Sequence, residues 1–332
     1  MKAVIPVAGL GTRLRPHTFT TPKPLLEVAG KPILAHILDE LVKLDAEEVT
    51  FIVHYFGDII EEWVKKNYSF KSNFVFQEEL LGLGHAISLA EPLHRDSDSV
   101  LIILGDTIFR ADLEEVLKWK ENAIGVRKVE DPRRFGIVEL EDGKVSNLLE
   151  KPEKPPTNLA IVGIYNITQP ALMFDSLDKI IETGKTTKGE IQLTDALQLM
   201  LKNEAVFRTF EIDGWYDCGK PETMLETNRE LLKLNSTVEH SETIRKRYPE
   251  AVIKPPVAIH NSVKISDSVI GPYVTVGEGT EIENSIIRNS IIGKKAKVSD
   301  ILMEGSLVGE ETVANDRFIQ LNISDSSEIS IV

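Results

Sequence analysis

A six-residue repeat of aliphatic residues near the end of the chain constrains the fold most strongly. Serine, asparagine, aspartate and glycine stand between the aliphatic positions, and Gly271, Gly277 and Gly293 directly follow members of the series. This period is typical of a parallel β-helix, in which each short strand lines a flat face and stacks on the next coil. The repeat predicts such a domain over residues 257–332, and its members are Val257, Val263 and Val269, then Ile270, Val276 and Ile282, then Ile286, Ile292 and Val298.

The larger first part of the chain has a different texture, because short apolar runs alternate there with helical patterns. Helical spacing covers Ile33–Leu44 and Leu113–Asn122. Alternation of this kind predicts an α/β domain over residues 1–235, a Rossmann-like, doubly wound, mostly parallel sheet that binds ligands beyond the carboxyl ends of its strands. A polar stretch, 236–256, is expected as a linker. The expected strands are Val4–Val7, Val49–His54, Asn73–Gln77, Val100–Leu104, Ala123–Val129 and Ala160–Ile167.

Composition limits the classes of partner. The 332 residues suggest about two domains, and 38 basic against 52 acidic residues give a net charge of −14. This charge repels polyanions, so we expect no nucleic-acid or membrane partner, and any affinity for phosphate must be local. The only cysteine, Cys218, excludes an intramolecular disulfide, the first residues form a strand pattern and not a leader, and no long apolar run occurs. We therefore expect a cytoplasmic enzyme.

The stretch Val4–Val28 carries the strongest chemical signal. A buried strand, Ala3–Ala8, runs into a turn in which Gly9 and Gly11 let backbone N–H groups approach phosphate oxygens. Three basic residues follow. The strand, the turn and these residues together predict a binding site for a triphosphate. These residues are Arg13, Arg15 and Lys23.

The spacing rejects the two best-known glycine loops. A dinucleotide fingerprint would need glycine where Leu14 stands, and the Walker loop is absent. The stretch resembles the signature of the sugar-1-phosphate nucleotidyltransferases, the pyrophosphorylases that make nucleotide sugars, in which G-x-G-T-R-(x)-x-P-x-T leads into P-K-P. The residues that match are Gly9, Gly11, Thr12, Arg13, Pro16, Thr18, Pro22, Lys23 and Pro24.

Two aspartates are candidate metal ligands. Transfer of a nucleotidyl group to a sugar phosphate brings two polyanions together, and Mg²⁺ with one or two carboxylates offsets that repulsion. Asp106 follows the strand SVLIIL in LGDTIF, which resembles the family's L-G-D motif. Asp217 lies in WYDCG, which resembles W-x-D-x-G, where the family aspartate joins the first in holding the metal. We therefore expect Mg²⁺ as the cofactor.

The resemblance also places the sugar phosphate. In EKP, Lys151 matches the lysine that holds the phosphate, and Glu150 matches the glutamate that bonds sugar hydroxyls. Gly136 matches a glycine whose backbone meets the sugar, although Phe135 stands where the family often has tyrosine. Val162, in AIVGIYNI, is a candidate backbone contact, and Lys188, in KGEIQLTD, matches a basic position that helps bind phosphate in the thymidylyl branch.

Base recognition is assigned to FQEELLGLGHAI, which matches the Q-x-x-x-x-G-(L)-x-x-A pattern of the thymidylyl and uridylyl transferases. Gln77 can pair with a pyrimidine edge, and Gly82 lets a flat base lie against the backbone. Uracil and thymine differ by one methyl group, worth about 1–3 kcal/mol, so the choice between them stays open. His85 is interpreted as a helix-surface or packing residue and not as an acid or base. The expected nucleotide-binding residues are Ala8, Gly9, Gly11, Thr12, Gln77 and Gly82.

The resemblance implies that the chain makes an NDP-sugar and pyrophosphate from dTTP or UTP and a sugar 1-phosphate, above all glucose 1-phosphate. Long-form glucose-1-phosphate thymidylyltransferases carry a similar C-terminal extension, a left-handed hexapeptide-repeat β-helix. Three residues are implied to be catalytic. Arg13 would stabilise the leaving pyrophosphate, Lys23 would bridge phosphates near the reacting centre, and Lys151 would hold the nucleophile.

Other readings stay open. A uridylyltransferase, or an enzyme for N-acetylglucosamine 1-phosphate or mannose 1-phosphate, would differ only in its base or sugar pocket. A non-catalytic regulatory subunit would bind nucleotide sugars without turning them over, and an acyltransferase would use His260 as its base. We favour a packing or assembly role for the β-helix and expect a homo-oligomer. Five candidate residues speak against lost catalysis, namely Arg13, Lys23, Asp106, Lys151 and Asp217.

Overall fold

The computed structural model describes residues 1–315, so residues 316–332 of the predicted β-helix lie outside its described part. The chain forms two compact units. The α/β unit comprises Met1–Leu26 and Lys31–Met224, and the β-helix unit comprises Glu27–Gly30 together with the chain from Leu225 onwards.

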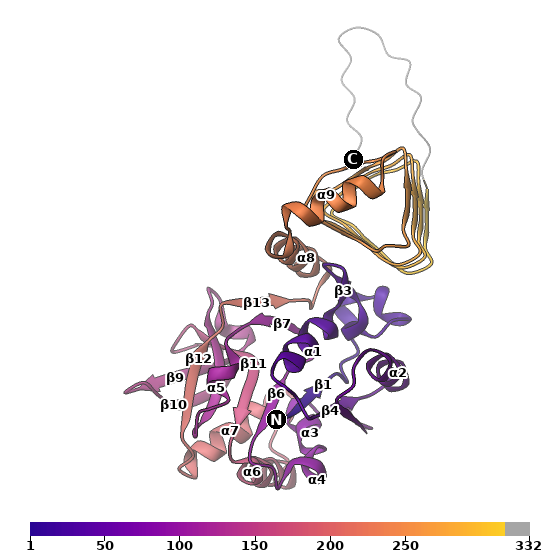
Figure 1. Ribbon diagram of the computed structural model, residues 1–332. Helices are drawn as coiled ribbons and strands as arrows, with labels where there is room; N and C mark the ends of the chain where they lie inside the picture. The colour runs from indigo at the N-terminus through magenta and orange to yellow at the C-terminus, as the bar shows by residue number, and fades with distance from the viewer. Residues whose placement is uncertain (316–332) are drawn as a thin grey trace. The chain divides into compact units, whose positions relative to one another are not determined.

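A nine-stranded mixed sheet forms the centre of the α/β unit (Figure 1). Four neighbouring strands run parallel, in the order β6-β1-β4-β5, and β11 runs antiparallel to β6, β8 and β9. The strands are β1 (Lys2–Pro6), β4 (Glu48–Val53), β5 (Lys71–Phe76), β6 (Val100–Ile103), β8 (Asn122–Lys128), β9 (Gly136–Glu141), β10 (Lys144–Glu150), β11 (Leu159–Ile167) and β12 (Phe207–Glu211).

Helices cover both faces of this sheet, because its strands are apolar on both sides. Along β1, Val4 joins one hydrophobic cluster, whereas Ala3 and Ile5 join the other. The first cluster includes α3 (Leu83–Ser88), α6 (Pro170–Glu182) and α7 (Leu193–Lys202), and the second includes α1 (Ile33–Lys43), α2 (Gly57–Asn67) and α5 (Leu113–Val116). Helix α4 (Glu91–His94) follows α3 in the chain. The doubly wound α/β prediction is confirmed.

The predicted strands and the helix from Ile33 are confirmed, with ends displaced by at most two residues. The predicted helix Leu113–Asn122 is too long, because α5 ends at Val116. The buried Asn122 instead begins β8, where its amide Nδ2 donates to Gln169 Oε1 and to the Val206 carbonyl. A helix that ran to Asn122 would be incompatible with this position in the sheet.

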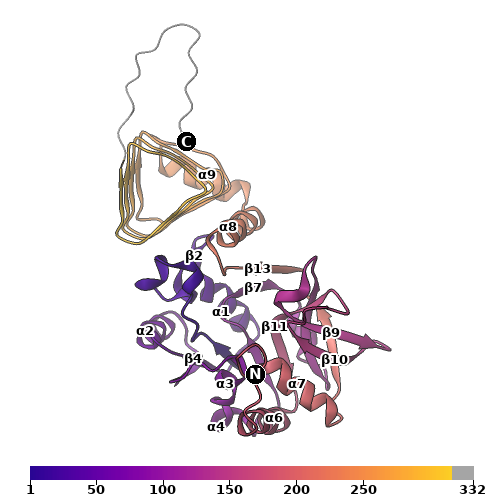
Figure 2. The same cartoon turned by 180° about the vertical axis from the view of Figure 1, so that it is seen from behind.

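The carboxyl ends of the parallel strands bring the candidate loops to one edge of the sheet. The glycine loop follows β1, Asp106 follows β6, and Gln77 follows β5. A short antiparallel ribbon of β7 (Thr107–Arg110) and β13 (Gly214–Asp217) adds to this edge. Figure 2 shows the same unit from behind, with β7 beside β13.

The β-helix unit stacks three parallel four-stranded sheets into coils of triangular outline (Figure 1). Aspartate and asparagine adopt a positive φ at coil corners, as at Asp267, Asn284 and Asp300. The strands are β14 (Val252–Ile253), β15 (Val257–Ile259), β16 (Lys264–Ser266), β17 (Val269–Ile270), β18 (Val274–Val276), β19 (Glu281–Glu283), β20 (Ile286–Arg288), β21 (Ile291–Ile292), β22 (Lys297–Ser299), β23 (Leu302–Glu304), β24 (Leu307–Val308) and β25 (Val313–Asn315). The predicted β-helix is confirmed in the described residues.

Two helices belong to the connection between the repeat and the rest of the chain. Helix α8 (Pro221–Asn235) begins in the α/β unit, and α9 (Val238–Arg247) supplies Ile244 to the core of the β-helix. The exposed His260 makes its Nδ1 contacts with Ser262 of its own coil, to the hydroxyl at 2.9 Å and to the backbone N–H at 3.3 Å.

Candidate active site

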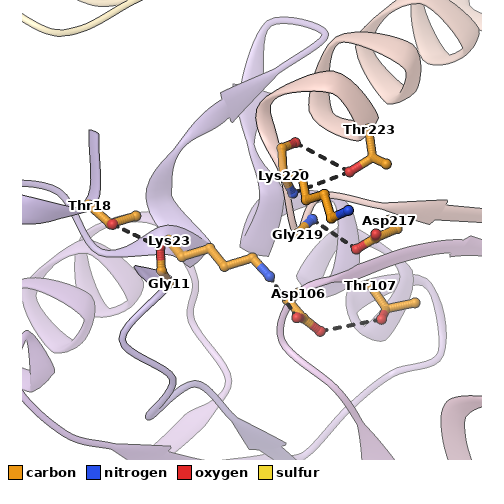
Figure 3. A network of polar contacts seen from close by, with 9 residues as sticks. All are labelled: Gly11, Thr18, Lys23, Asp106, Thr107, Asp217, Gly219, Lys220 and Thr223. Carbon is orange, nitrogen blue, oxygen red and sulfur yellow. Dashed lines mark hydrogen bonds and ion pairs between the residues drawn. The ribbon is translucent and has the colours of Figure 1, made fainter. Parts of the chain in front are cut away.

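The glycine loop is held by hydrogen bonds to the Gly11 carbonyl from residues that follow it in the chain. Gly11 has φ 60°, and a Cβ there would lie 2.9 Å from Thr18 Cγ2, so the position favours glycine on both counts. The Thr18 hydroxyl donates to the Gly11 carbonyl at 2.9 Å (Figure 3). Leu14 N–H donates to the same carbonyl at 2.9 Å. The turn is therefore fixed before any ligand arrives.

This loop lines a cavity of about 560 Å³, which we call the nucleotide cavity. All six residues predicted to bind the nucleotide lie in its wall, together with two of the predicted catalytic residues. The eight are Ala8, Gly9, Gly11, Thr12, Arg13, Lys23, Gln77 and Gly82.

Gln77 is buried in the wall of the nucleotide cavity. Its Nε2 faces the Gly82 carbonyl at 3.4 Å and His85 Nδ1 at 3.1 Å. The backbone carbonyl of Gln77 accepts a hydrogen bond from His54 Nδ1 at 2.7 Å. Gly82 has φ 116° and packs so closely on the Ile191 carbonyl that a Cβ would lie 2.6 Å from the oxygen. His85 therefore does more than pack, because it contacts the residue predicted to read the base.

Lys23 and Asp106 form an ion pair at 2.6 Å between Nζ and Oδ2 (Figure 3). Burial raises the pKa of the Asp106 carboxyl, but the Lys23 ammonium, with smaller help from Thr107 and Arg13, outweighs burial and holds that pKa below its ordinary value. Asp106 is therefore ionised at neutral pH. The stability that this carboxylate contributes is present above its unfolded pKa and is lost as the pH falls through the lowered folded value.

Asp217 lies beside this pair although the two aspartates are 111 positions apart in the chain. In the ribbon of β7 and β13, Asp217 pairs in register with Thr107, the residue next to Asp106. Its Oδ1 accepts from Gly219 N–H at 2.8 Å (Figure 3). A Cβ at Gly219 would lie 2.8 Å from that Oδ1 and 2.9 Å from a guanidinium nitrogen of Arg13. Gly219 thus leaves room for both side chains.

Asp106 and Asp217 supply oxygen ligands suited to Mg²⁺. Among residues 1–315 no group of three or more His, Cys, Asp or Glu side chains could hold a metal ion without help. Mg²⁺ commonly takes only one or two carboxylates and completes its shell with substrate phosphates and water. A pair of neighbouring carboxylates therefore fits a metal that is bound together with its substrate.

A second cavity, of about 890 Å³, holds all five residues predicted to bind the sugar phosphate, and we call it the sugar-phosphate cavity. Both lysines among them adopt a positive φ, 43° at Lys151 and 55° at Lys188. Such a backbone conformation is uncommon outside glycine and clusters at functional sites. The five are Gly136, Glu150, Lys151, Val162 and Lys188.

The Glu150 carboxylate is buried and already oriented. The Thr194 hydroxyl donates to its Oε2 at 2.7 Å, and Lys151 Nζ lies 3.2 Å from its Oε1. Lys151 N–H donates to the Phe135 carbonyl at 3.0 Å, which fixes the turn after β10. Both oxygens therefore have fixed positions toward the cavity.

Several residues in the wall of the sugar-phosphate cavity were not predicted from the sequence. Thr194 lies in KGEIQLTD, where only the lysine was predicted to bind, and Trp215 lies in WYDCG, where only the aspartate was predicted to bind. Trp215 meets Phe135 edge to face at 4.9 Å between ring centroids. Tyr165 also lines the cavity, and burial raises the pKa of its hydroxyl. Reading the whole motif segments would have found the first two.

The two cavities share part of their walls, and Arg13 and Asp106 belong to both. The two cavities therefore adjoin at these residues. No helix of residues 1–315 is both long and apolar enough to cross a membrane.

Comparison with known proteins gives a consistent result. Residues 2–234 match the family model described as nucleotidyl transferase. The chain is 33% identical to the low-salt glycan biosynthesis nucleotidyltransferase Agl11 of Haloferax volcanii, over 94% of this chain and 99% of that protein. It is 35% identical to the bifunctional protein GlmU of Methanocaldococcus jannaschii, over 93% and 78%. It is 32% identical to a glucose-1-phosphate thymidylyltransferase of Streptomyces antibioticus, over 93% and 92%.

The fold is also similar to that of a protein of known structure. The fold is similar to that of a UDP-glucose pyrophosphorylase complexed with UDP-glucose, with a TM-score of 0.61 and 26% identity. That similarity covers 70% of this chain and 99% of the other.

Proposed function

Because the chain belongs to the family of sugar-1-phosphate nucleotidyltransferases, we propose that it transfers the nucleotidyl group of dTTP or UTP to glucose 1-phosphate. The meeting of the nucleotide cavity and the sugar-phosphate cavity at Arg13 and Asp106 carries this proposal. A triphosphate in the first cavity would present its α-phosphorus at the wall that both cavities share. A sugar phosphate in the second would face that phosphorus.

The proposed reaction is one displacement at phosphorus. A phosphate oxygen of the sugar 1-phosphate forms a bond to the α-phosphorus, and the bond from that phosphorus to the oxygen leading to the β-phosphate breaks. Pyrophosphate leaves with the electron pair. The attacking phosphate is already ionised, so no side chain needs to take a proton from it. Catalysis then depends on positioning and on neutralising charge.

Each basic residue has a place in that displacement. Lys151 and Lys188 line the sugar-phosphate cavity and would hold the attacking phosphate. Arg13 lies in both cavities, and its guanidinium can engage two oxygens of the departing pyrophosphate. Lys23 would exchange its contact with Asp106 for contacts with substrate phosphates.

Asp106 and Asp217 are the proposed metal ligands. Bound Mg²⁺ would neutralise charge on the phosphates of the triphosphate. The pKa of Asp106 is held low, so its carboxylate is ready to bind a cation without releasing a proton at neutral pH.

Substrate choice rests on the two pockets. Gln77 and Gly82 in the nucleotide cavity favour a pyrimidine, and similarity to both a thymidylyltransferase and a UDP-glucose pyrophosphorylase supports dTTP and UTP equally. Glu150, oriented by Thr194, is suited to accept hydrogen bonds from vicinal sugar hydroxyls.

A substrate panel tests this proposal. Purified protein with Mg²⁺ is assayed for pyrophosphate release with each of dTTP, UTP, ATP and GTP. Each triphosphate is combined with the 1-phosphates of glucose, N-acetylglucosamine and mannose. We expect release to be fastest with a pyrimidine triphosphate and glucose 1-phosphate. Faster release with a different sugar 1-phosphate would show that glucose 1-phosphate is not the preferred substrate. The absence of release with every pair would overturn the proposed function.

We also propose that the chain forms a homo-oligomer through one face of the β-helix. The four strands of one sheet align Val252, Val269, Ile286 and Leu302 in register, and Leu302 is 74% exposed. An aligned row of aliphatic side chains, of which Val252, Ile286 and Leu302 are exposed, is typical of an interaction surface. Sedimentation of wild type and Leu302→Lys tests it, because the substitution should lower the assembled mass. An unchanged mass would exclude this face.

A further inference from the structure

The chain enters the β-helix unit at two places, and each place closely follows a candidate active-site residue. Glu27, the first residue of the β-helix unit, comes four residues after Lys23. Leu225, where the chain enters that unit again within α8, comes eight residues after Asp217. Two short segments, which we call the tethers, therefore connect the site to the β-helix unit. One runs from Lys23 to Glu27 and the other from Asp217 to Leu225.

The tether from Lys23 is stiff. Lys23 begins the short 3₁₀ helix η3 (Lys23–Leu25), in which Leu25 N–H donates to the Pro22 carbonyl at 2.8 Å. Leu26 N–H donates to the Lys23 carbonyl at 3.1 Å. Leu25 is buried in the core of the α/β unit. Only Leu26 then separates this turn from Glu27.

Within the β-helix unit, the segment Glu27–Gly30 is held at three points. The Ala29 N–H donates to Asn228 Oδ1 at 2.8 Å. Glu27 Oε1 lies 3.3 Å from Lys294 Nζ. Gly30 packs so closely that a Cβ there would lie 2.9 Å from Ala258 Cβ. The strand β2 (Glu27–Val28), with Val28 fully buried, is thus fixed to the coils.

Asn228 is the residue that joins the two tethers. It lies on α8, eleven residues after Asp217, and is fully buried. Its Oδ1 accepts from both the Ala29 N–H and the Thr275 hydroxyl, the latter at 2.6 Å. Its Nδ2 donates to the Tyr273 carbonyl at 3.2 Å. An amide buried this deeply is stable only because its partners are in place.

We propose that Asn228 is a positioning residue for nucleotidyl transfer: it ties the segment that follows Lys23 to the helix that follows Asp217. This inference rests on the proposed function. Lys23 contacts Asp106, and Asp217 pairs opposite Thr107, so both tethers lead to the same end of the site. Catalysis by positioning is sensitive to small displacements, because a misplacement of about 1 Å can cost about 100-fold in rate.

Steady-state kinetics of the full chain tests the proposal. Asn228→Ala should lower kcat by about 10-fold to 100-fold and change both KM values by less than about three-fold. Asn228→Asp keeps the acceptor for the Ala29 N–H but loses the donor to the Tyr273 carbonyl, so it should restore kcat only in part. Arg229→Ala is the matched control, because the neighbouring residue on α8 reaches Asn289 but not the segment Glu27–Gly30. The proposal is overturned if Asn228→Ala keeps the wild-type kcat, or if Arg229→Ala loses as much.

Hydrogen exchange gives a readout that does not need activity. The amides of Leu25 and Leu26 should exchange at least about ten-fold faster in Asn228→Ala than in wild type or Arg229→Ala. Faster exchange in a protein that shows no transferase activity would support the tether and overturn the proposed function instead. Unchanged exchange together with normal kcat would overturn the tether and leave the function standing.

A milder variant guards against misfolding of Asn228→Ala. Lys294→Met removes the partner of Glu27 at a partly exposed position, and the amide of Asn228 stays in place. We expect a smaller effect in the same direction, about three-fold in kcat with faster exchange at Leu26. Wild-type kcat and exchange in this variant would count against the tether.

Discussion

In the α/β unit, the buried polar side chains of Lys23 and Gln77 line a cavity, and each reaches toward space that a ligand can fill. In the β-helix unit, the buried hydroxyls of Thr280 and Ser285 instead bond to the backbone of the coils. Thr280 Oγ1 donates to the Gly293 carbonyl at 2.7 Å, and Ser285 Oγ donates to the Glu283 carbonyl at 2.7 Å.

Buried polar groups in the two units therefore have different roles, one structural and one at the cavity wall. A hydroxyl that closes a coil corner is satisfied within the fold, so its loss changes stability. A charged group held at a cavity wall is paired only with other site residues, so its loss changes binding and turnover. Apart from Asn228 and Lys294, which hold the segment Glu27–Gly30, substitutions in the β-helix unit should therefore change stability, whereas substitutions at the cavity walls should change kinetics.

The largest effect is expected at the two aspartates. Asp106→Asn or Asp217→Asn should lower kcat by about 10³-fold or more, because each removes a ligand charge from one proposed metal site. The double substitution should cost little more than the worse single one, since groups that act as a unit are not additive. Kinetics of the three variants with Mg²⁺ checks this.

Asp112→Asn is the control for these aspartate variants, because Asp112 caps α5 away from both cavities. Additive losses in the double variant would show that the two carboxylates act independently. Wild-type turnover in either single variant would remove that residue from the site.

A smaller loss is expected from Arg13→Ala, about 10²–10³-fold in kcat, with little change in the KM for glucose 1-phosphate. The guanidinium lies in both cavities, where charge develops on the leaving pyrophosphate. Arg208→Ala is the control, because the Arg208 guanidinium lies over the Trp119 ring at 3.9 Å and not in the wall of either cavity. A raised KM with normal kcat would make Arg13 a uniform binding contact.

Thr194→Val should raise the KM for glucose 1-phosphate by about ten-fold and leave kcat within about three-fold of wild type. The hydroxyl bonds the buried Glu150 carboxylate at 2.7 Å, and a hydrogen bond to a charged group is worth about 1.5–3 kcal/mol. Thr157→Val removes a comparable bond, to the Val138 carbonyl, outside the cavity. Equal effects of the two substitutions would mean that Thr194 only stabilises the fold.

The smallest effect on turnover is expected in the β-helix core. Ile287 is fully buried there, and Ile287→Ala should lower the free energy of unfolding by about 2–5 kcal/mol. At a temperature where the variant stays folded, kcat should remain within about two-fold of wild type. Urea unfolding and kinetics on the same preparation check both parts. A large loss of kcat in the folded variant would show that the core of the β-helix takes part in catalysis.

Local sequence was enough to predict much of this molecule. The six-residue repeat predicted the coils because each aliphatic position lies at a fixed step along a flat face. The candidate residues of the glycine loop and of the segments LGDTIF and WYDCG were predicted because each lies in a short contiguous motif. The structure then placed these residues around two adjoining cavities.

Contacts between distant residues could not be predicted in this way. The Thr194 hydroxyl reaches Glu150 across 44 positions, and Ala29 meets Asn228 across 199. No spacing in the sequence encodes either pair. The helix expected to run to Asn122 ends early for a similar reason, since the buried amide of Asn122 is needed in the sheet.

Exchange of labelled pyrophosphate into the nucleoside triphosphate tests the central claim most directly, namely that a sugar phosphate in one cavity attacks the triphosphate in the other. A single displacement predicts no exchange with enzyme, Mg²⁺, triphosphate and pyrophosphate alone, because no nucleotidyl group is released without its acceptor. Exchange should begin when glucose 1-phosphate is added and NDP-glucose forms. Exchange of equal rate without any sugar phosphate would contradict the account, because it would require a covalent nucleotidyl-enzyme.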